Sequence, residues 1–249
     1  MERKKYIPII VGLVLFCAGD IYGQSPQKAI YDAYIESDMR KWRVIMLQFA
    51  ETQSKNLEQK LELVGYYYGY TAWHIDNEKG KLASHYIAAA EALLDEILSQ
   101  HGVDASLMAT AHAYKGAFIG YKIGLYPLKA PFIGPKSIKH TERAFILDPQ
   151  NIQAHIDFGN SLFYRPSILG GDKMSAIIHY KKAIKLFEAK KDTVDNWRYL
   201  NILSALGQAH ESVDQFKQAR SVYEKTLRIE PKFIWVRDEL LPSLQQQSN

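Results

Sequence analysis

Histidine is the residue of this chain with the widest range of possible chemistry, because imidazole titrates near neutral pH and ligates transition metals. The eight histidines stand at positions 74, 85, 101, 112, 140, 155, 179 and 210. A metalloprotease helix needs two histidines four residues apart with a glutamate beside the first. No two of these are four residues apart. The spacing therefore predicts no metal site, and places each histidine at the core edge or on the surface.

Other catalytic motifs are also absent from the sequence. It contains no P-loop, no dinucleotide-binding fingerprint and no Gly-x-Ser-x-Gly elbow. Cys17 is the only cysteine and lies in a segment that we expect to be removed, so the rest of the chain has neither a thiol nucleophile nor a disulfide. The carboxylates are spaced as on a solvated helix face. We therefore expect a protein that is not an enzyme and has no cofactor.

Residues 1–23 read as a secretory signal peptide. Three basic residues precede an apolar run from Tyr6 to Ala18, which is too short to span a bilayer comfortably. Cleavage after Gly23 would leave 24–249 as one exported domain, most simply in the periplasm. The alternative is a lipoprotein anchored through Cys17, although Phe16 stands where a small residue is usual. Membrane association is expected only in that case.

The composition suits one sizeable globular domain. The chain has 249 residues, 47% of them hydrophobic, and a net charge of +4 without a basic run. A weak, dispersed positive charge indicates a solvated surface, so we expect no nucleic-acid partner.

The stretch from Leu200 to Phe233 has the most specific pattern. It resembles a tetratricopeptide repeat (TPR), in which two antiparallel helices cross at small residues. The matching positions are Leu203, Leu206, Gly207, His210, Ala219, Tyr223 and Pro231. Gly207 and Ala219 would lie at the crossing, where a larger side chain would push the helices apart. None of these residues does chemistry.

Similar periodicity recurs along the chain. The clearest repeats span about 57–100, 104–149, 150–188 and 200–233, after a degenerate first hairpin that Ser25 and Pro26 open. Phe233, Trp235, Val236 and Leu240 form a helix that can cover the open end of the stack. The predicted fold is all-α: a TPR-like α-solenoid of antiparallel helix pairs with a closing C-terminal helix.

Two segments depart from the repeat pattern. Pro127, Pro131 and Pro135 predict a long loop over 126–136, running to a helix that begins at Pro135. Its candidate binding residues are Tyr126, Lys129, Phe132 and Lys136. The second segment is an elongated turn, in which Gly170 and Gly171 allow a tight reversal and Asp172 caps the next helix.

Three segments carry a wider resemblance to exported TPR proteins of Bacteroidetes-type bacteria. They read KIGLYPLKAPFIGPKSIKH, FYRPSILGGDKMSAIIHYKKAI and YEKTLRIEPKFIWVRDEL. The Gly-Gly-Asp turn also resembles one in the T-component of tripartite transporters. These resemblances imply a fold and a location in the cell envelope, but no activity.

In TPR proteins the first helix of each pair lines a concave groove. The resemblance places Tyr66, Tyr70, Gln153, Asn160, Phe163, Tyr164, Asn201 and Gln208 there, with Glu62 beside them. This amide-rich, aromatic lining suits an extended peptide, a neutral ligand or a hydrophobic tail. Our first hypothesis is a scaffold that binds an envelope protein or peptide through the groove and the 126–136 loop. The alternative is a periplasmic protein that binds a small molecule or lipid.

Overall fold

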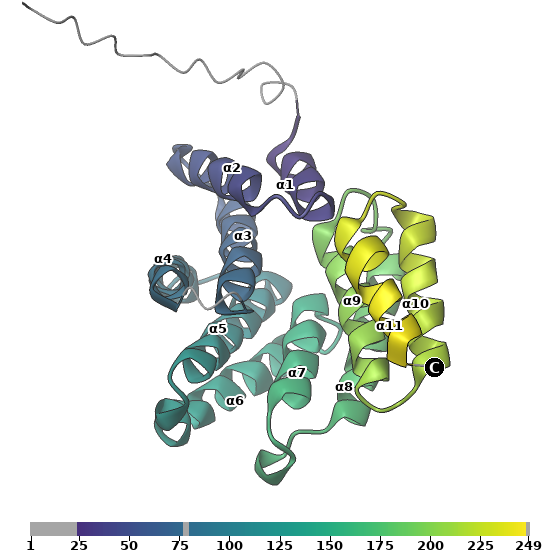
Figure 1. The fold of residues 1–249 in the computed structure, drawn as a ribbon. Helices are drawn as coiled ribbons and strands as arrows, with labels where there is room; N and C mark the ends of the chain where they lie inside the picture. Colours follow the sequence, from purple (N-terminus) through teal and green to yellow (C-terminus); the bar gives the residue numbers. More distant parts are fainter. Residues whose placement is uncertain (1–23, 77–79, 248–249) are drawn as a thin grey trace, which may run out of the picture.

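The structure is a computed structural model that describes residues 24–76 and 80–247. This part of the chain forms eleven α-helices and three short helical turns, and contains no β-strand (Figure 1). The elements are α1 (Pro26–Ile35), α2 (Met39–Glu51), α3 (Leu57–Asp76), α4 (Gly80–Leu98), α5 (Ala105–Leu125), η1 (Pro127–Lys129), α6 (Ala130–Leu147), α7 (Ile152–Tyr164), η2 (Ser167–Leu169), α8 (Lys173–Ala189), α9 (Trp197–Glu211), α10 (Phe216–Ile229), η3 (Trp235–Leu240) and α11 (Leu241–Gln247). The predicted signal peptide and Cys17 lie outside the described residues. Within them, no helix has the length and apolar character needed to cross a membrane.

Several helices begin at the capping residues that the sequence predicts. The Ser25 side chain accepts a hydrogen bond from the Lys28 amide at the start of α1. Asp104 and Asp172 do the same for the first amides of α5 and α8. These side chains satisfy amide groups that have no partner inside the helix. Gly170, before α8, has a φ of 86°, which confirms the predicted tight reversal.

The prediction of a loop over 126–136 is wrong. The segment forms η1 and the first part of α6, which begins at Ala130 rather than at Pro135. Pro131 lies in the first helical turn, where a missing N–H costs nothing. Pro135 does interrupt the hydrogen-bond ladder, but packing against α5 holds the helix: Thr141 and Ala144 are buried, and the Ser137 hydroxyl donates to the Gly116 carbonyl at 2.8 Å.

Consecutive helices pack as antiparallel pairs, and each pair packs on the next (Figure 1). The pairs are α1 with α2, α3 with α4, α5 with α6, α7 with α8, and α9 with α10. In two of them the helices meet over a tyrosine ring. A Cβ at Gly207 would lie 2.2 Å from the Tyr223 ring, and a Cβ at Gly159 would lie 2.5 Å from the Tyr180 ring. The close approach predicted at Gly207 is thus confirmed, with Tyr223 as the residue that fills the crossing.

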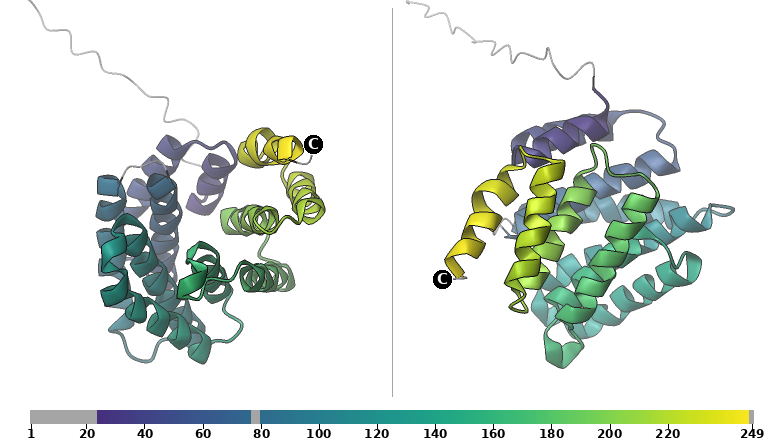
Figure 2. Two further views of the ribbon diagram at one scale, coloured as in Figure 1. Left: turned by 60° about the horizontal axis from the view of Figure 1, so that its bottom comes forward. Right: turned by 90° about the vertical axis from the view of Figure 1, so that its right-hand side faces the viewer.

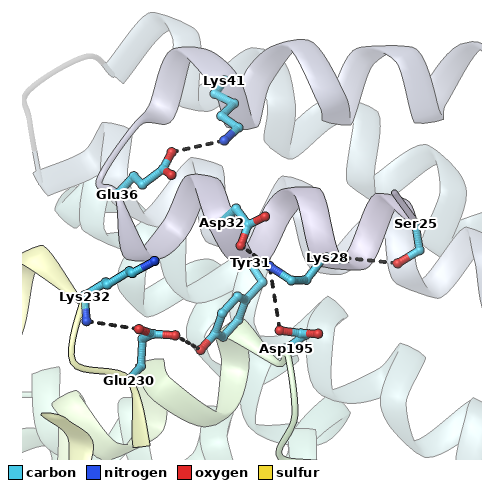
Figure 3. Close-up of polar contacts among 9 residues, drawn as sticks. All are labelled: Ser25, Lys28, Tyr31, Asp32, Glu36, Lys41, Asp195, Glu230 and Lys232. Carbon is cyan, nitrogen blue, oxygen red and sulfur yellow. Dashed lines mark hydrogen bonds and ion pairs between the residues drawn. The ribbon is translucent and has the colours of Figure 1, made fainter. Parts of the chain in front are cut away.

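The two ends of the helical array meet. In the left view of Figure 2 the N-terminal helices lie beside the C-terminal ones. The Tyr34 ring of α1 lies 5.1 Å from the Phe233 ring and 5.7 Å from the Trp197 ring, between centroids. Polar contacts add to this closure (Figure 3): the Tyr31 hydroxyl donates to Glu230 at 2.8 Å, and Lys28 lies 3.9 Å from Asp195. Helices far apart in the sequence are therefore held together by aromatic and polar contacts.

The glycine crossing gives a direct test of the packing. Gly207→Ala should lower the free energy of unfolding by roughly 1–3 kcal/mol, because the added methyl group overlaps the Tyr223 ring. Urea denaturation of the purified domain measures this loss.

Gly120→Ala is the matched control, since Gly120 is exposed within α5 and a Cβ there meets no atom within 4 Å. It should leave stability unchanged or raise it by up to about 1 kcal/mol. Equal effects at the two positions would show that Gly207 is not a close crossing.

Candidate functional site

A cavity of about 320 Å³ opens between α3, α5 and the start of α9. Residues from four helices and one connection line it: Gln27, Glu58, Leu61, Glu62, Gly65, Tyr66, Leu107, Thr110, Tyr114, Asp192, Asn196, Trp197 and Arg198. Its volume is at the lower end of the range for small-molecule sites. Because α1 and α9 are far apart in the sequence, the part of the wall that they form depends on the contact between them.

One part of the wall is aromatic and apolar. Tyr66, Tyr114 and Trp197 are almost fully buried by their surroundings, and Leu61 lies beside them. The Tyr66 hydroxyl donates to the Glu62 carboxylate in the same helix. Burial, and then this carboxylate, raise the pKa of Tyr66 far above its ordinary value. Tyr66 therefore stays neutral, with its hydroxyl donating to Glu62, and this part of the wall can pack against an apolar ligand.

Arg198 brings the only cationic side chain among the lining residues. Its guanidinium lies 3.4 Å from the Gln153 side-chain oxygen, to which it donates, and 3.9 Å from Asp192. Gln153 in turn donates to Asp157 at 3.0 Å. Gln153 and Asp157 are buried and do not line the cavity, so they hold Arg198 in place from outside it.

Asp157, at the end of these contacts, has a carboxyl group with a strongly raised pKa. It is buried, and its Oδ1 has no hydrogen-bond partner among the described residues. Burial raises the pKa of Asp157 to about 7, against the opposing effects of hydrogen bonds from Gln153 and Tyr68 and of the Arg198 charge. The group is thus poised between its two protonation states at neutral pH.

Of the groove residues predicted from the sequence, Tyr66 lines the cavity. Gln153 lies behind Arg198, and Asn160 donates to the Tyr68 hydroxyl at 2.9 Å and accepts from the Tyr180 hydroxyl at 2.8 Å. Asn201 donates to the Tyr34 hydroxyl at 3.0 Å. These amides bind other parts of the same chain.

The other predicted residues lie elsewhere. Tyr70 is buried, with its ring 5.1 Å from the Tyr86 ring. Phe163 and Gln208 are partly buried, and Tyr164 is exposed. The four residues of the 126–136 segment lie on the surface around η1: Tyr126, Lys129, Phe132 and Lys136. The structure does not bring these residues together with the cavity.

Sequence reasoning missed most of the cavity wall. Tyr114, Asp192 and Arg198 line the cavity, but they are not among the candidate residues predicted from the sequence. Glu58 lies one turn before the predicted Glu62. A pattern of short range cannot show that these segments converge, because the convergence arises from packing between distant helices.

Four of the eight histidines form two pairs with similar geometry. His112 and His140 join α5 to α6 with their Nδ1 atoms 2.9 Å apart, and His155 and His179 join α7 to α8 at 3.0 Å. Burial lowers the pKa of His112 and of His155 to about 4, and the neighbouring imidazole contributes in each case. In the part of the chain that the structure describes, no three metal-ligating side chains come together.

Comparisons with solved structures give a likeness of fold. No protein-family model matches the chain, and no curated protein matches it. Among solved structures it is similar to the HusA haemophore from Porphyromonas gingivalis, with a TM-score of 0.57 and 16% identity. The alignment covers 75% of this chain and 90% of that chain. At this identity the likeness concerns the fold alone.

Asp157 makes stability depend on pH in a predictable direction. An unfolded aspartate has a pKa near 3.8, so between there and about pH 7 the folded protein binds more protons than the unfolded chain. This group's contribution to stability therefore falls as the pH rises through that window. The stability of Asp157→Asn relative to the wild type should rise over the same window, measured by denaturation at several pH values. A difference independent of pH would contradict the raised pKa.

The histidine pairs predict the opposite dependence of stability on pH. Since the pKa of His155 is about 4 when folded and near 6.5 when unfolded, stability should fall as the pH drops from 6.5 to 4. His155→Gln should lose less stability than the wild type over this interval in the same experiment. If both proteins lose equal stability, His155 does not bind protons differently in the two states.

Proposed function

We propose that this chain is an exported, non-enzymatic binding protein that holds a small ligand in its central cavity. The observation that carries the proposal is the cavity itself, which helices far apart in the sequence line with aromatic side chains and hydrogen-bonding groups. Concave, largely apolar sites with a few placed polar groups are the usual form of small-molecule sites.

The fold likeness supports the same reading. A haemophore carries haem, so the similar fold of HusA serves a protein that binds a small molecule. The sequence resemblance to a T-component of tripartite transporters points the same way. We propose further that the helix pairs are TPR-like repeats, and that the N-terminal segment directs export to the periplasm, with a lipoprotein as the alternative.

Native mass spectrometry of the protein purified gently from its host tests the proposal. We expect extra mass of small-molecule size on the wild type. Glu58→Trp should lose that mass, because the indole would fill the mouth of a cavity of about 320 Å³. Haem added to ligand-free protein, followed by its absorption spectrum, tests whether the ligand of HusA is shared.

Phe132→Ser is the matched control, because Phe132 lies on the surface outside the cavity and should leave the bound mass unchanged. The proposal of a small-molecule carrier would be refuted if the wild type carried no small molecule from its host and host extracts did not change its melting temperature. A ligand that binds the native state and not the unfolded chain must raise the stability of the protein.

A protein-binding scaffold remains the second candidate, and one observation favours it. Large apolar side chains are exposed at the two turns around η1 and η2: Leu128 (92%), Phe132 (79%), Ile168 (92%) and Leu169 (62%). Exposed apolar groups of this size mark interaction surfaces when they cluster. In the scaffold, Phe132→Ser combined with Ile168→Ser would abolish recovery of an envelope protein while leaving the cavity intact.

A further inference from the structure

The charge of the cavity is unevenly distributed between its two sides. Three carboxylates and one guanidinium are among the lining residues: Glu58, Glu62, Asp192 and Arg198. Arg198 faces Asp192 at 3.9 Å, and the charges of Asp192 and Asp157 both act on it. The α9 side of the cavity is therefore close to neutral.

The α3 side carries negative charge without compensation. Glu58 and Glu62 stand four residues apart on one face of α3, where like charges repel each other. Among the described residues, neither carboxylate forms an ion pair with a lysine or arginine; Glu62 accepts only the Tyr66 hydroxyl. The nearest basic residue along this helix, Lys60, pairs with Glu96 and does not line the cavity.

The aromatic walls point to the same kind of ligand independently of these charges. Tyr66, Tyr114 and Trp197 are among the residues that line the cavity. The face of an aromatic ring attracts a cation through its quadrupole, by roughly 0.5–2 kcal/mol. Rings and carboxylates around one space together form a receptor for an organic cation.

We propose that the cavity takes a ligand whose cationic group, an ammonium or a guanidinium, lies against Glu58 and Glu62 while its apolar body packs on Tyr66, Tyr114 and Trp197. This inference rests on the proposed function and names the class of ligand. A ligand with several carboxylates would be repelled by Glu58 and Glu62, since Arg198 is already matched by its own acids. A purely apolar ligand would bring no positive charge to Glu58 and Glu62, and covering carboxylates without an ionic partner is costly.

Three indole compounds of similar shape test the charge preference: tryptamine, tryptophol and indole-3-propionate, which carry an ammonium, a hydroxyl and a carboxylate. Calorimetric titration at low salt should give the tightest binding for tryptamine and the weakest for indole-3-propionate. Tryptamine binding should also weaken as salt is added, because salt screens the carboxylates.

The variant Glu58→Gln/Glu62→Gln keeps the shape of the site and an acceptor for Tyr66. It should bind tryptamine roughly tenfold more weakly, the effect of losing about 1.4 kcal/mol, with tryptophol unchanged. Glu36→Gln/Glu224→Gln removes two exposed carboxylates outside the cavity and should behave as the wild type. This control separates the cavity from the net charge of the protein.

The possible results are distinct. If tryptamine binds no better than tryptophol, or fails to bind, the cationic class is overturned, while the carrier itself stands or falls on the native mass measurement. If both double variants weaken tryptamine equally, the attraction comes from net charge and the proposed site is wrong. Selective loss in Glu58→Gln/Glu62→Gln alone supports it.

Discussion

The contact between the two ends of the chain is the constraint on which the rest of the structure depends. Tyr34 and Trp42, from the first helix pair, pack against Trp197 at the start of α9, with ring centroids 5.7 Å and 5.0 Å away. Phe233 lies 5.1 Å from Tyr34 on the other side. Aromatic pairs of this kind contribute about 0.5–1.5 kcal/mol each beyond the area that they bury. Joining segments more than 150 residues apart costs loop entropy that grows only slowly with length, so a few buried rings can offset it.

The same contact shapes the candidate site. Trp197 belongs both to the aromatic closure and to the cavity wall, and Arg198 follows it directly. Gly69 of α3 leaves room for this arrangement, because a Cβ there would lie 2.8 Å from the Trp197 ring. The position of Arg198 in the cavity wall is therefore set by the packing of Trp197. A loss of closure would separate the two walls of the cavity, even with each helix pair intact.

Local signals in the sequence predicted the parts of the fold that have local causes. Asp104 and Asp172 cap helices because their side chains reach amides two or three residues later, and Gly207 marks a crossing because only glycine leaves space for the Tyr223 ring. Pro135 misled the prediction, since the packing of α6 on α5 outweighs the hydrogen bond that proline cannot donate. For the site, one groove residue of the predicted set, Tyr66, lines the cavity. Asn160 and Asn201 instead bind tyrosines of other helices, which no pattern within one helix could indicate.

The buried chain from Asp157 through Gln153 to Arg198 lowers stability yet gives the cavity its electrostatic asymmetry. A carboxyl group whose pKa is raised to about 7 by burial disfavours the folded state once it ionises. When it is ionised, its charge acts on Arg198, as the charge of Asp192 does. The charge of Arg198 is balanced by acids on its own side of the cavity. The carboxylates of α3 can therefore attract a cationic group of a ligand.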